Sequence, residues 1–388
     1  MNNKPRYSKG TMRNQIVNLM HVSMIMTSRS YKLFQKPQRI ADVMVLLRKE
    51  EVIERSHNKE AFDNMLLTTY EYNVDEYFYD NIEDDNIDYF ETYGRNDIKK
   101  AKYEKDDTQT RSSRIIKNGE TIIFMYSAGV PTLPSEKKNI VQNGRITDNV
   151  YYQSREIKQY SGYMDDVNEE ERAVITTRIN GTLLTAGGNY NVYHIGKEIQ
   201  MWAVQGEYKI KGYIEQMLSS YINRESCLLQ SAILLTYDLN VFIKLIDPTR
   251  KLRARYEGLA LTYENLYILP YDSNGRDMLK VMTEKDWIDR LKYYIMEEYP
   301  EDTRMLQVVC DYYDEEVYTL VFCIPDIKKY IDFIRKATII NDKKQFHIIC
   351  FDYQLEFIKA SAERYAAISV ADFNEFRKNW FKTESNKE

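Results

Sequence analysis

The sequence predicts an α/β fold with at least two structural units, and it leaves an α+β arrangement open as the alternative. Its 388 residues are enough for two or three domains of roughly 100–200 residues each. Hydrophobic residues make up 43% of the chain and charged residues 29%, so a large core and a well-solvated surface are both available. After about Gly206, short apolar runs alternate with helical stretches, an order typical of a substantially parallel sheet.

Residues 1–60 predict a basic helical unit. They carry twelve Lys or Arg against five Asp or Glu. Thr11 can cap a first helix and Pro37 can begin a second, because both residue types are preferred at helix starts. Apolar residues repeat at helical spacing in both segments, at Ile16, Leu19, Met20 and Met24 and at Ile40, Val43, Met44 and Leu47. Two short helices with basic flanks fit a helix-turn-helix, and they fit a plain helical bundle as well.

Residues 61–118 predict a charged connector. Residues 61–93 hold ten acids and no Lys or Arg, and residues 94–118 turn basic again. Such charge blocks are typical of loosely ordered segments that contact a partner. The acidic part also contains aromatic residues, which favour docking on a protein surface: Tyr77, Phe78, Tyr89 and Phe90.

Residues 119–205 predict a helix followed by a β-hairpin. Asn168 can cap a helix over 168–179, and acids in its first turn suit the helix dipole. Alternating residues then predict strands at 182–186 and 190–195, joined by a turn at 187–189. This order is found in a winged helix, with 151–160 as the preceding helix. The alternative is a helix and hairpin packed into a larger α+β sheet.

Residues 206–384 predict the α/β domain. Apolar runs of strand length lie at 228–237, 264–271, 306–310, 317–324 and 346–351. Helical patterns lie between several of them, at 278–296, 326–337 and 353–365.

Absent motifs exclude several classes of enzyme. The chain has no GxxxxGK[ST] loop, no GxGxxG after a strand, no GxSxG and no HExxH. It also lacks the HxxR of a tyrosine recombinase and the histidine pair of a rolling-circle relaxase. Four cysteines form no CxxC pair and are expected to be buried free thiols: Cys227, Cys310, Cys323 and Cys350.

The expected location is the cytoplasm. No stretch approaches the roughly 18 consecutive apolar residues of a membrane helix. The start of the chain is polar and basic and lacks the apolar region of a signal peptide. We therefore expect no membrane contact, and no motif implies a cofactor.

Two sets of basic residues are candidates for DNA binding, because Lys and Arg on one exposed face would neutralise phosphates. The first unit supplies Arg13, Arg29, Lys32, Lys36 and Arg39, and the helix over 168–179 supplies Arg172 and Arg178. An ordinary solvated surface is the alternative for both sets.

Four aspartates directly follow apolar runs, namely Asp238, Asp272, Asp311 and Asp352. Ligands bind outside the carboxyl ends of strands in α/β sheets, so these carboxylates are candidates to hold Mg²⁺. In the alternative, each aspartate caps a helix or starts a turn. Glu207 and Lys209 form a Glu-x-Lys pair similar to part of a restriction-type nuclease motif, but they lie in a helical pattern where a strand is required.

Segments within 151–218 resemble uncharacterised proteins of clostridial conjugative elements, which are similar in outline to the replication-relaxation type. The resemblance rests on YYQSREIK, TRINGTLLTAGGNYNVYHIG and QMWAVQGEYKIKGYIEQML, with KGTMRN and ADVMVLLRKEEVI nearer the start. It implies a winged-helix region joined to an α/β region and carries over no catalytic residue.

Three hypotheses about function follow, and whether the chain is an enzyme stays open among them. The first is a DNA-associated accessory or regulatory protein of a bacterial mobile element, serving conjugation or replication. The second is a metal-dependent, nuclease-like α/β enzyme that uses Mg²⁺. The third is a non-catalytic protein-interaction module whose partner binds the acidic connector.

Overall fold

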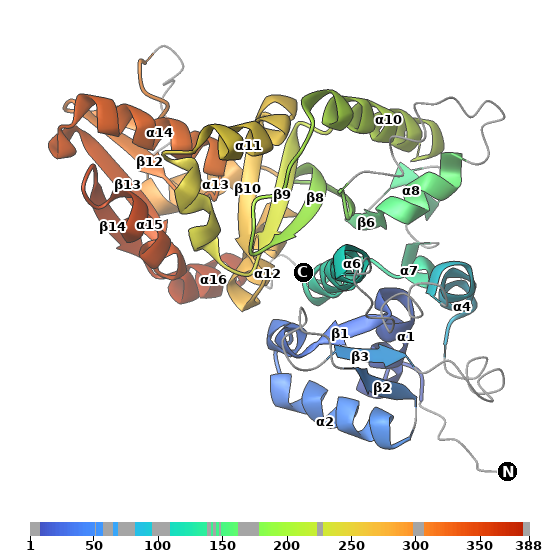
Figure 1. Cartoon of the computed structure of the whole chain (residues 1–388). Helices are drawn as coiled ribbons and strands as arrows, with labels where there is room; N and C mark the ends of the chain where they lie inside the picture. The colour runs from blue at the N-terminus through green and yellow to red at the C-terminus, as the bar shows by residue number, and fades with distance from the viewer. Residues whose placement is uncertain are drawn as a thin grey trace, which may run out of the picture.

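The computed structural model shows a chain of mixed helix and sheet, as an α/β fold requires (Figure 1). It describes residues 8–50, 52–56, 65–68, 82–94, 109–137, 141–142, 145–146, 149–161, 178–222, 228–297 and 306–382. Three parts can be distinguished: an N-terminal unit, a five-stranded sheet with helices on both faces, and a four-stranded sheet near the C-terminus.

The N-terminal unit combines helices with a small antiparallel sheet of order β1-β3-β2. Along the chain its elements are α1 (Met12–Ser23), β1 (Ile25–Thr27), η1 (Ser28–Leu33), α2 (Pro37–Lys49), β2 (Ile53–Ser56) and β3 (Met65–Thr68). Thr11 caps α1 by accepting a hydrogen bond from the amide of Asn14, and Pro37 opens α2 at its first position. Met24 ends α1 with a left-handed backbone, φ 64°.

The apolar stripes predicted for the first two helices face the core. Every predicted residue of both stripes is buried: Ile16, Leu19, Met20, Met24, Ile40, Val43, Met44 and Leu47. Because a three-stranded sheet completes the unit, it is not a plain helical bundle.

Part of the predicted acidic connector is structured. Strand β3 pairs with β1 and β2, and α4 (Asp84–Tyr89) continues into η3 (Phe90–Gly94). Helix α4 packs against α1 and against the short helix α7 (Pro134–Lys137), with Tyr89 and Phe90 buried. Tyr77 and Phe78 lie outside the described residues.

Helix α6 (Gln109–Ser127) connects the N-terminal unit with the five-stranded sheet. It packs against α1, β1 and η1 on one side and against β8 on the other. In Figure 1 it lies between the blue N-terminal unit and the green and yellow strands. Two short strands follow α7, β4 (Val141–Gln142) and β5 (Arg145–Ile146), paired antiparallel.

The five-stranded sheet has the order β10-β9-β8-β7-β6. Its strands are β6 (Val150–Gln153), β7 (Gly181–Thr185), β8 (Gly188–Gly196), β9 (Ser231–Thr236) and β10 (Asn265–Pro270). Strands β8, β9 and β10 run parallel, and β6, β7 and β8 are antiparallel neighbours. Helix α8 (Ser154–Ser161) directly follows β6.

Both faces of this sheet are buried, which explains why β9 and β10 are almost continuously apolar. On β9, Ala232 and Leu234 join the core formed with α10 (Val204–Ile222) and α11 (Arg250–Thr262). The alternate residues Ile233 and Leu235 join the core that contains α12 (Ser273–Met282), α13 (Trp287–Met296) and the N-terminal unit.

The predicted hairpin is confirmed, as β7 and β8, but it is not a wing. Strand β8 pairs with β7 on one side and with β9 on the other, so the hairpin is part of the sheet interior. The turn is at residues 186–187. Of the helix predicted over 168–179, residues 168–177 lie outside the described residues. Residues 178–180 are described and are not helical. The alternative, a hairpin packed into a larger sheet, is therefore the arrangement observed.

The four-stranded sheet has the order β11-β12-β13-β14, with β12, β13 and β14 parallel. Its strands are β11 (Tyr312–Asp314), β12 (Val317–Val321), β13 (Phe346–Phe351) and β14 (Ala367–Ala371), with helices α14 (Ile327–Ile340), α15 (Leu355–Ala362) and α16 (Phe373–Lys382). Short 3₁₀ segments are η4 (Leu239–Leu245), η5 (Lys343–Gln345) and η6 (Asp352–Gln354).

The strands and helices predicted for residues 206–384 need three corrections. The run at 306–310 is not a strand, because β11 begins at Tyr312. The helix predicted over 278–296 is two helices, α12 and α13, separated by residues 283–286. The pattern also missed β14 and α16. Cys310, Cys323 and Cys350 are buried free thiols as expected, and Cys227 lies outside the described residues.

In the part of the chain that the structure describes, every helix is too short or too polar to cross a bilayer.

Candidate nucleic-acid interface

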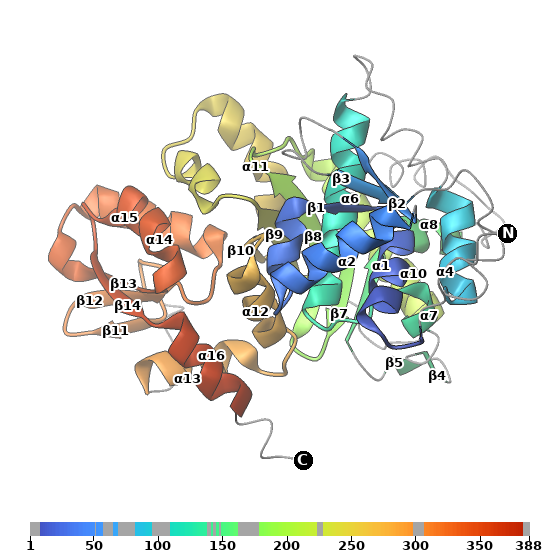
Figure 2. The same ribbon diagram turned by 90° about the horizontal axis from the view of Figure 1, so that it is seen from below.

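Helix α2 has one face in the core and one face in solvent. Ile40, Val43 and Leu47 hold it against α1 and the small sheet, since these side chains are buried. Exposed side chains line the opposite face: Gln38, Arg39, Asp42, Val45, Arg48 and Lys49. Figure 2, seen from below, shows α2 in front of the sheets, with its outer face uncovered.

Three basic residues surround the start of α2. Lys32 is in η1, Lys36 directly precedes Pro37, and Arg39 is in the first turn of the helix; all three are exposed. None of them makes an ion pair or side-chain hydrogen bond with the residues that the structure describes. In a helix-turn-helix, the N-terminal residues of the second helix contact base edges, and cations around them contact phosphates.

The other predicted DNA-binding residues lie elsewhere. Arg13 is directed to Glu50, with Nη1 3.5 Å from Oε1. Arg29 is mostly buried, so it is not part of an exposed basic face. Arg178 is exposed in the irregular segment before β7 and donates to Gln200 Oε1 at 3.1 Å. Arg172 lies outside the described residues.

Arg29 belongs to a buried polar cluster centred on Glu120 of α6. Its Nε lies 3.4 Å from Glu120 Oε1, and its guanidinium carbon stands 3.8 Å from the ring centroid of Tyr237. Thr27 donates to Glu120 Oε1 at 2.6 Å, and the Tyr237 hydroxyl donates to Oε2. His194 Nε2 lies 3.2 Å from the same Oε2. The Glu120 and His194 side chains are fully buried.

The charges in this cluster can be assigned from its contacts. Burial opposes ionisation of Glu120, but His194, Arg29 and Thr27 outweigh burial and hold the pKa of the carboxyl below its ordinary value. Burial lowers the pKa of His194, although Glu120 works in the opposite direction. These contacts favour an ionised Glu120, with Arg29 as its permanent cation.

This cluster lies where the parallel strands end. His194 is near the carboxyl end of β8, Tyr237 directly follows β9, and Tyr271 directly follows β10. Tyr271 reaches the N-terminal unit through a 2.9 Å hydrogen bond with Ser30. In α/β sheets this edge is the usual place for ligands. Here it is occupied by residues of β1, η1 and α6, so the cluster joins two parts of the fold.

Sequence analysis did not find this cluster. Its residues come from β1, η1, α6, β8 and the segment after β9, and no spacing along the chain links them.

Three of the four strand-end aspartates cap a helix or start a turn, as the alternative interpretation expects, and Asp311 is a buried ion-pair partner instead. Asp238 and Asp272 accept hydrogen bonds from backbone amides at the starts of η4 and α12. Asp352 accepts from the amides of Tyr353 and Phe373. Asp311 is buried and pairs with two lysines, at 2.8 Å from Lys292 Nζ and 2.5 Å from Lys329 Nζ.

No metal site forms from these side chains. Within the described ranges, no three His, Cys, Asp or Glu side chains come together as a group that could hold a metal ion. Glu207 is on α10, where its Oε2 accepts a 2.6 Å hydrogen bond from the Tyr193 hydroxyl. The Glu-x-Lys pair is thus on a helix, and a nuclease site would need it on a strand.

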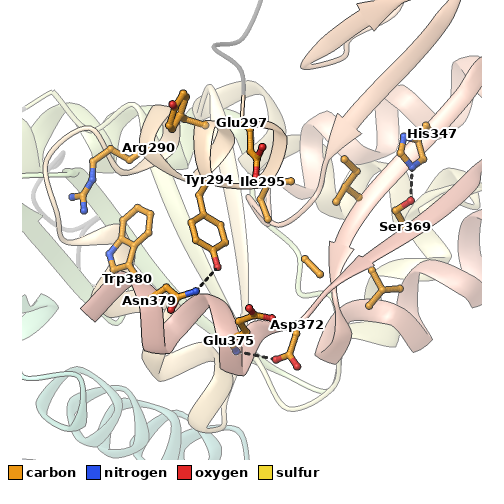
Figure 3. Close-up of a pocket in the computed structure, with 14 residues that line it drawn as sticks. Arg290, Tyr294, Ile295, Glu297, His347, Ser369, Asp372, Glu375, Asn379 and Trp380 are labelled. Carbon is orange, nitrogen blue, oxygen red and sulfur yellow. Dashed lines mark hydrogen bonds between the residues drawn. The ribbon is translucent and has the colours of Figure 1, made fainter. Parts of the chain in front are cut away.

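An open cavity of about 1080 Å³ lies between α13, α16 and one face of β13 and β14 (Figure 3). His347 Nε2 and Ser369 Oγ are 2.8 Å apart on this face. The pair resembles a base and a nucleophile, but no described carboxylate contacts His347 to orient it. Asp372 instead accepts from the amide of Glu375 at 2.9 Å. We therefore assign the cavity no catalytic role.

Comparison with known proteins identifies no relative: the chain matches no protein-family model, no curated protein and no solved structure.

Proposed function

We propose that this protein binds duplex DNA through its N-terminal unit, with α2 as the helix that enters the major groove. The observation that carries the proposal is the outer face of α2. It is exposed along the helix, and Lys32, Lys36 and Arg39 stand without partners in the described structure around its first turn. Cations in this position suit the phosphates that flank a major groove.

The order of elements supports the same proposal. Helix, strand, short helix, helix and a two-stranded hairpin follow one another, and the sheet order is β1-β3-β2. This is the order of a winged helix, with η1 and α2 as the helix pair and β2 and β3 as the wing. In this proposal the wing is β2 and β3 of the N-terminal unit, about 130 residues before the hairpin that the sequence pattern favoured as a wing.

The role we propose for this DNA binding is accessory or regulatory, within a bacterial mobile element. That context rests on the resemblance of residues 151–218 to proteins of conjugative elements. The chemistry proposed for this unit is recognition of duplex DNA through its exposed cations.

Replacing Arg39 by alanine is expected to weaken binding of a mixed-sequence DNA duplex about tenfold. The slope of log binding constant against log salt concentration is expected to fall by about 1, because the phosphate that Arg39 no longer contacts keeps its counterion. The matched control is Arg253→Ala, the same change at an exposed position of α11. Fluorescence anisotropy at several salt concentrations would measure both effects. Equal affinities for the two variants would argue against α2, and absence of wild-type binding at low salt would reject DNA binding.

A further inference from the structure

A groove of about 740 Å³ adjoins the start of α2. Its walls come from the end of η1, the beginning of α2, helix α12 and the C-terminal helix α16. Segment η1 packs directly on α12, and Pro37 at the start of α2 lines the groove with them. The groove therefore lies between the N-terminal unit and helices from the two larger sheets.

The groove is strongly basic. Twelve residues line it, of which six are Lys or Arg and one is an acid. The cations are Lys32, Arg276, Lys280, Arg377, Lys378 and Lys382, and the acid is Asp277. Cations outnumber the acid among the side chains that line the groove, so the groove attracts anions with several charges.

Asp277 fixes two of the cations in place. Its Oδ1 lies 2.7 Å from Nη2 of Arg276, and its Oδ2 lies 2.5 Å from Nη1 of Arg377. Arg276 also donates to the backbone carbonyl of Leu33, which ties α12 to η1. The pKa of Asp277 is below its ordinary value, because these arginines outweigh the effect of burial.

The remaining cations are accessible. Lys32 and Lys378 are exposed and make no ion pair or side-chain hydrogen bond with the described residues. Lys280 is 32% exposed, and its Nζ is 3.9 Å from Asp277 Oδ1, at the outer limit of an ion pair. Burial and the two neighbouring arginines lower the pKa of Lys280, so a bound anion would relieve an excess of positive charge.

We infer that this groove binds the sugar–phosphate backbone of the same DNA duplex whose major groove α2 enters. The inference rests on the proposed function. Lys32 and Pro37 belong both to the groove and to the helix pair, so a backbone strand beside α2 passes the groove. Cations on α16 and α12 then extend the interface beyond the N-terminal unit. A nucleotide or another compact polyanion would occupy the groove without involving α2.

The test compares two double variants of the full chain. Lys280→Gln with Lys378→Gln removes two groove cations that lie outside the helix pair, and Lys343→Gln with Lys344→Gln removes two exposed lysines of η5 at the opposite end of β13 from α16. Duplex binding is measured by anisotropy over a series of salt concentrations. We expect the groove variant to bind about tenfold more weakly at low salt, with a log–log slope smaller by about 2, and the η5 variant to match the wild type.

The outcomes separate this inference from the proposed function. If the groove variant matches the η5 variant while Arg39→Ala still weakens binding, the groove inference is overturned and DNA binding by α2 stands. If the wild type binds no duplex at low salt, both fail. Inorganic tripolyphosphate serves as a second probe. Tight binding of tripolyphosphate that depends on Lys280 and Lys378, with no change in duplex affinity, would overturn the inference in favour of a small-anion site.

Discussion

Replacing Arg29 by methionine is expected to destabilise the folded protein by about 3–5 kcal/mol, because the change leaves Glu120 as a buried charge without its cation. Thr27, Tyr237 and His194 still contact the carboxylate, and these contacts place the expected loss nearer the lower figure. Urea unfolding followed by circular dichroism would measure the free energy of unfolding.

A double variant gives this prediction its control. Arg29→Met combined with Glu120→Gln removes both charges, so we expect it to recover part of the lost stability. Arg253→Met, at an exposed position of α11, controls for the loss of an arginine as such and should change stability by less than about 0.5 kcal/mol. A loss below about 1 kcal/mol for Arg29→Met would contradict the assignment of an ionised Glu120.

Acidification from pH 6.5 to 4.5 is expected to cost about 2 kcal/mol of stability through His21 alone, because the unfolded histidine is already half protonated at pH 6.5. Burial lowers the pKa of His21 to about 3 in the folded protein, from about 6.5 in the unfolded chain. Between these values the unfolded chain binds up to one more proton, so folding stability falls as pH falls, by at most about 1.4 kcal/mol per pH unit. His194 acts in the same direction, since burial lowers its pKa too.

Comparing the wild type with His21→Phe isolates the contribution of His21 to the pH dependence of stability. His21 is in α1, with its ring centroid 5.2 Å from that of Phe90, so His21→Phe keeps an aromatic ring in the same core. We expect the free energy of unfolding of this variant to depend less on pH in the window 6.5 to 4.5. His347→Phe is the matched control, because His347 is only half-buried and should change the pH dependence less. Identical pH dependence in wild type and His21→Phe would contradict a buried neutral His21.

Local patterns predicted the elements well where a segment has one clear period. The stripes of α1 and α2, the strands β9, β10 and β13, and the hairpin β7–β8 follow from apolar spacing and turn residues. Strand β14 was missed because it is only five residues long and its side chains are exposed or half-buried, so no buried face marks it as a strand. The pattern also could not show that β8 pairs with β9, because pairing partners are set by packing far along the chain.

The candidate interface was only partly predictable, for a related reason. Charge and helix pattern indicated Lys32, Lys36 and Arg39, which are indeed exposed around α2. The same criteria selected Arg29, because composition does not reveal that Glu120 lies beside it in the fold. The groove cations of α16 were visible as the run RKNWFK, but only the fold brings that run next to η1.

The position of α6 has a consequence for how the protein unfolds. One hydrophobic core contains residues of α1, α2 and α6 together with one face of each of the two larger sheets. The Glu120 cluster adds polar contacts across the same junction. The N-terminal unit therefore has no core of its own to melt independently, although its sequence looks like a separate module. We expect calorimetry to record a single cooperative transition that includes the N-terminal unit, so that destabilising the sheet would also abolish the duplex binding proposed for that unit.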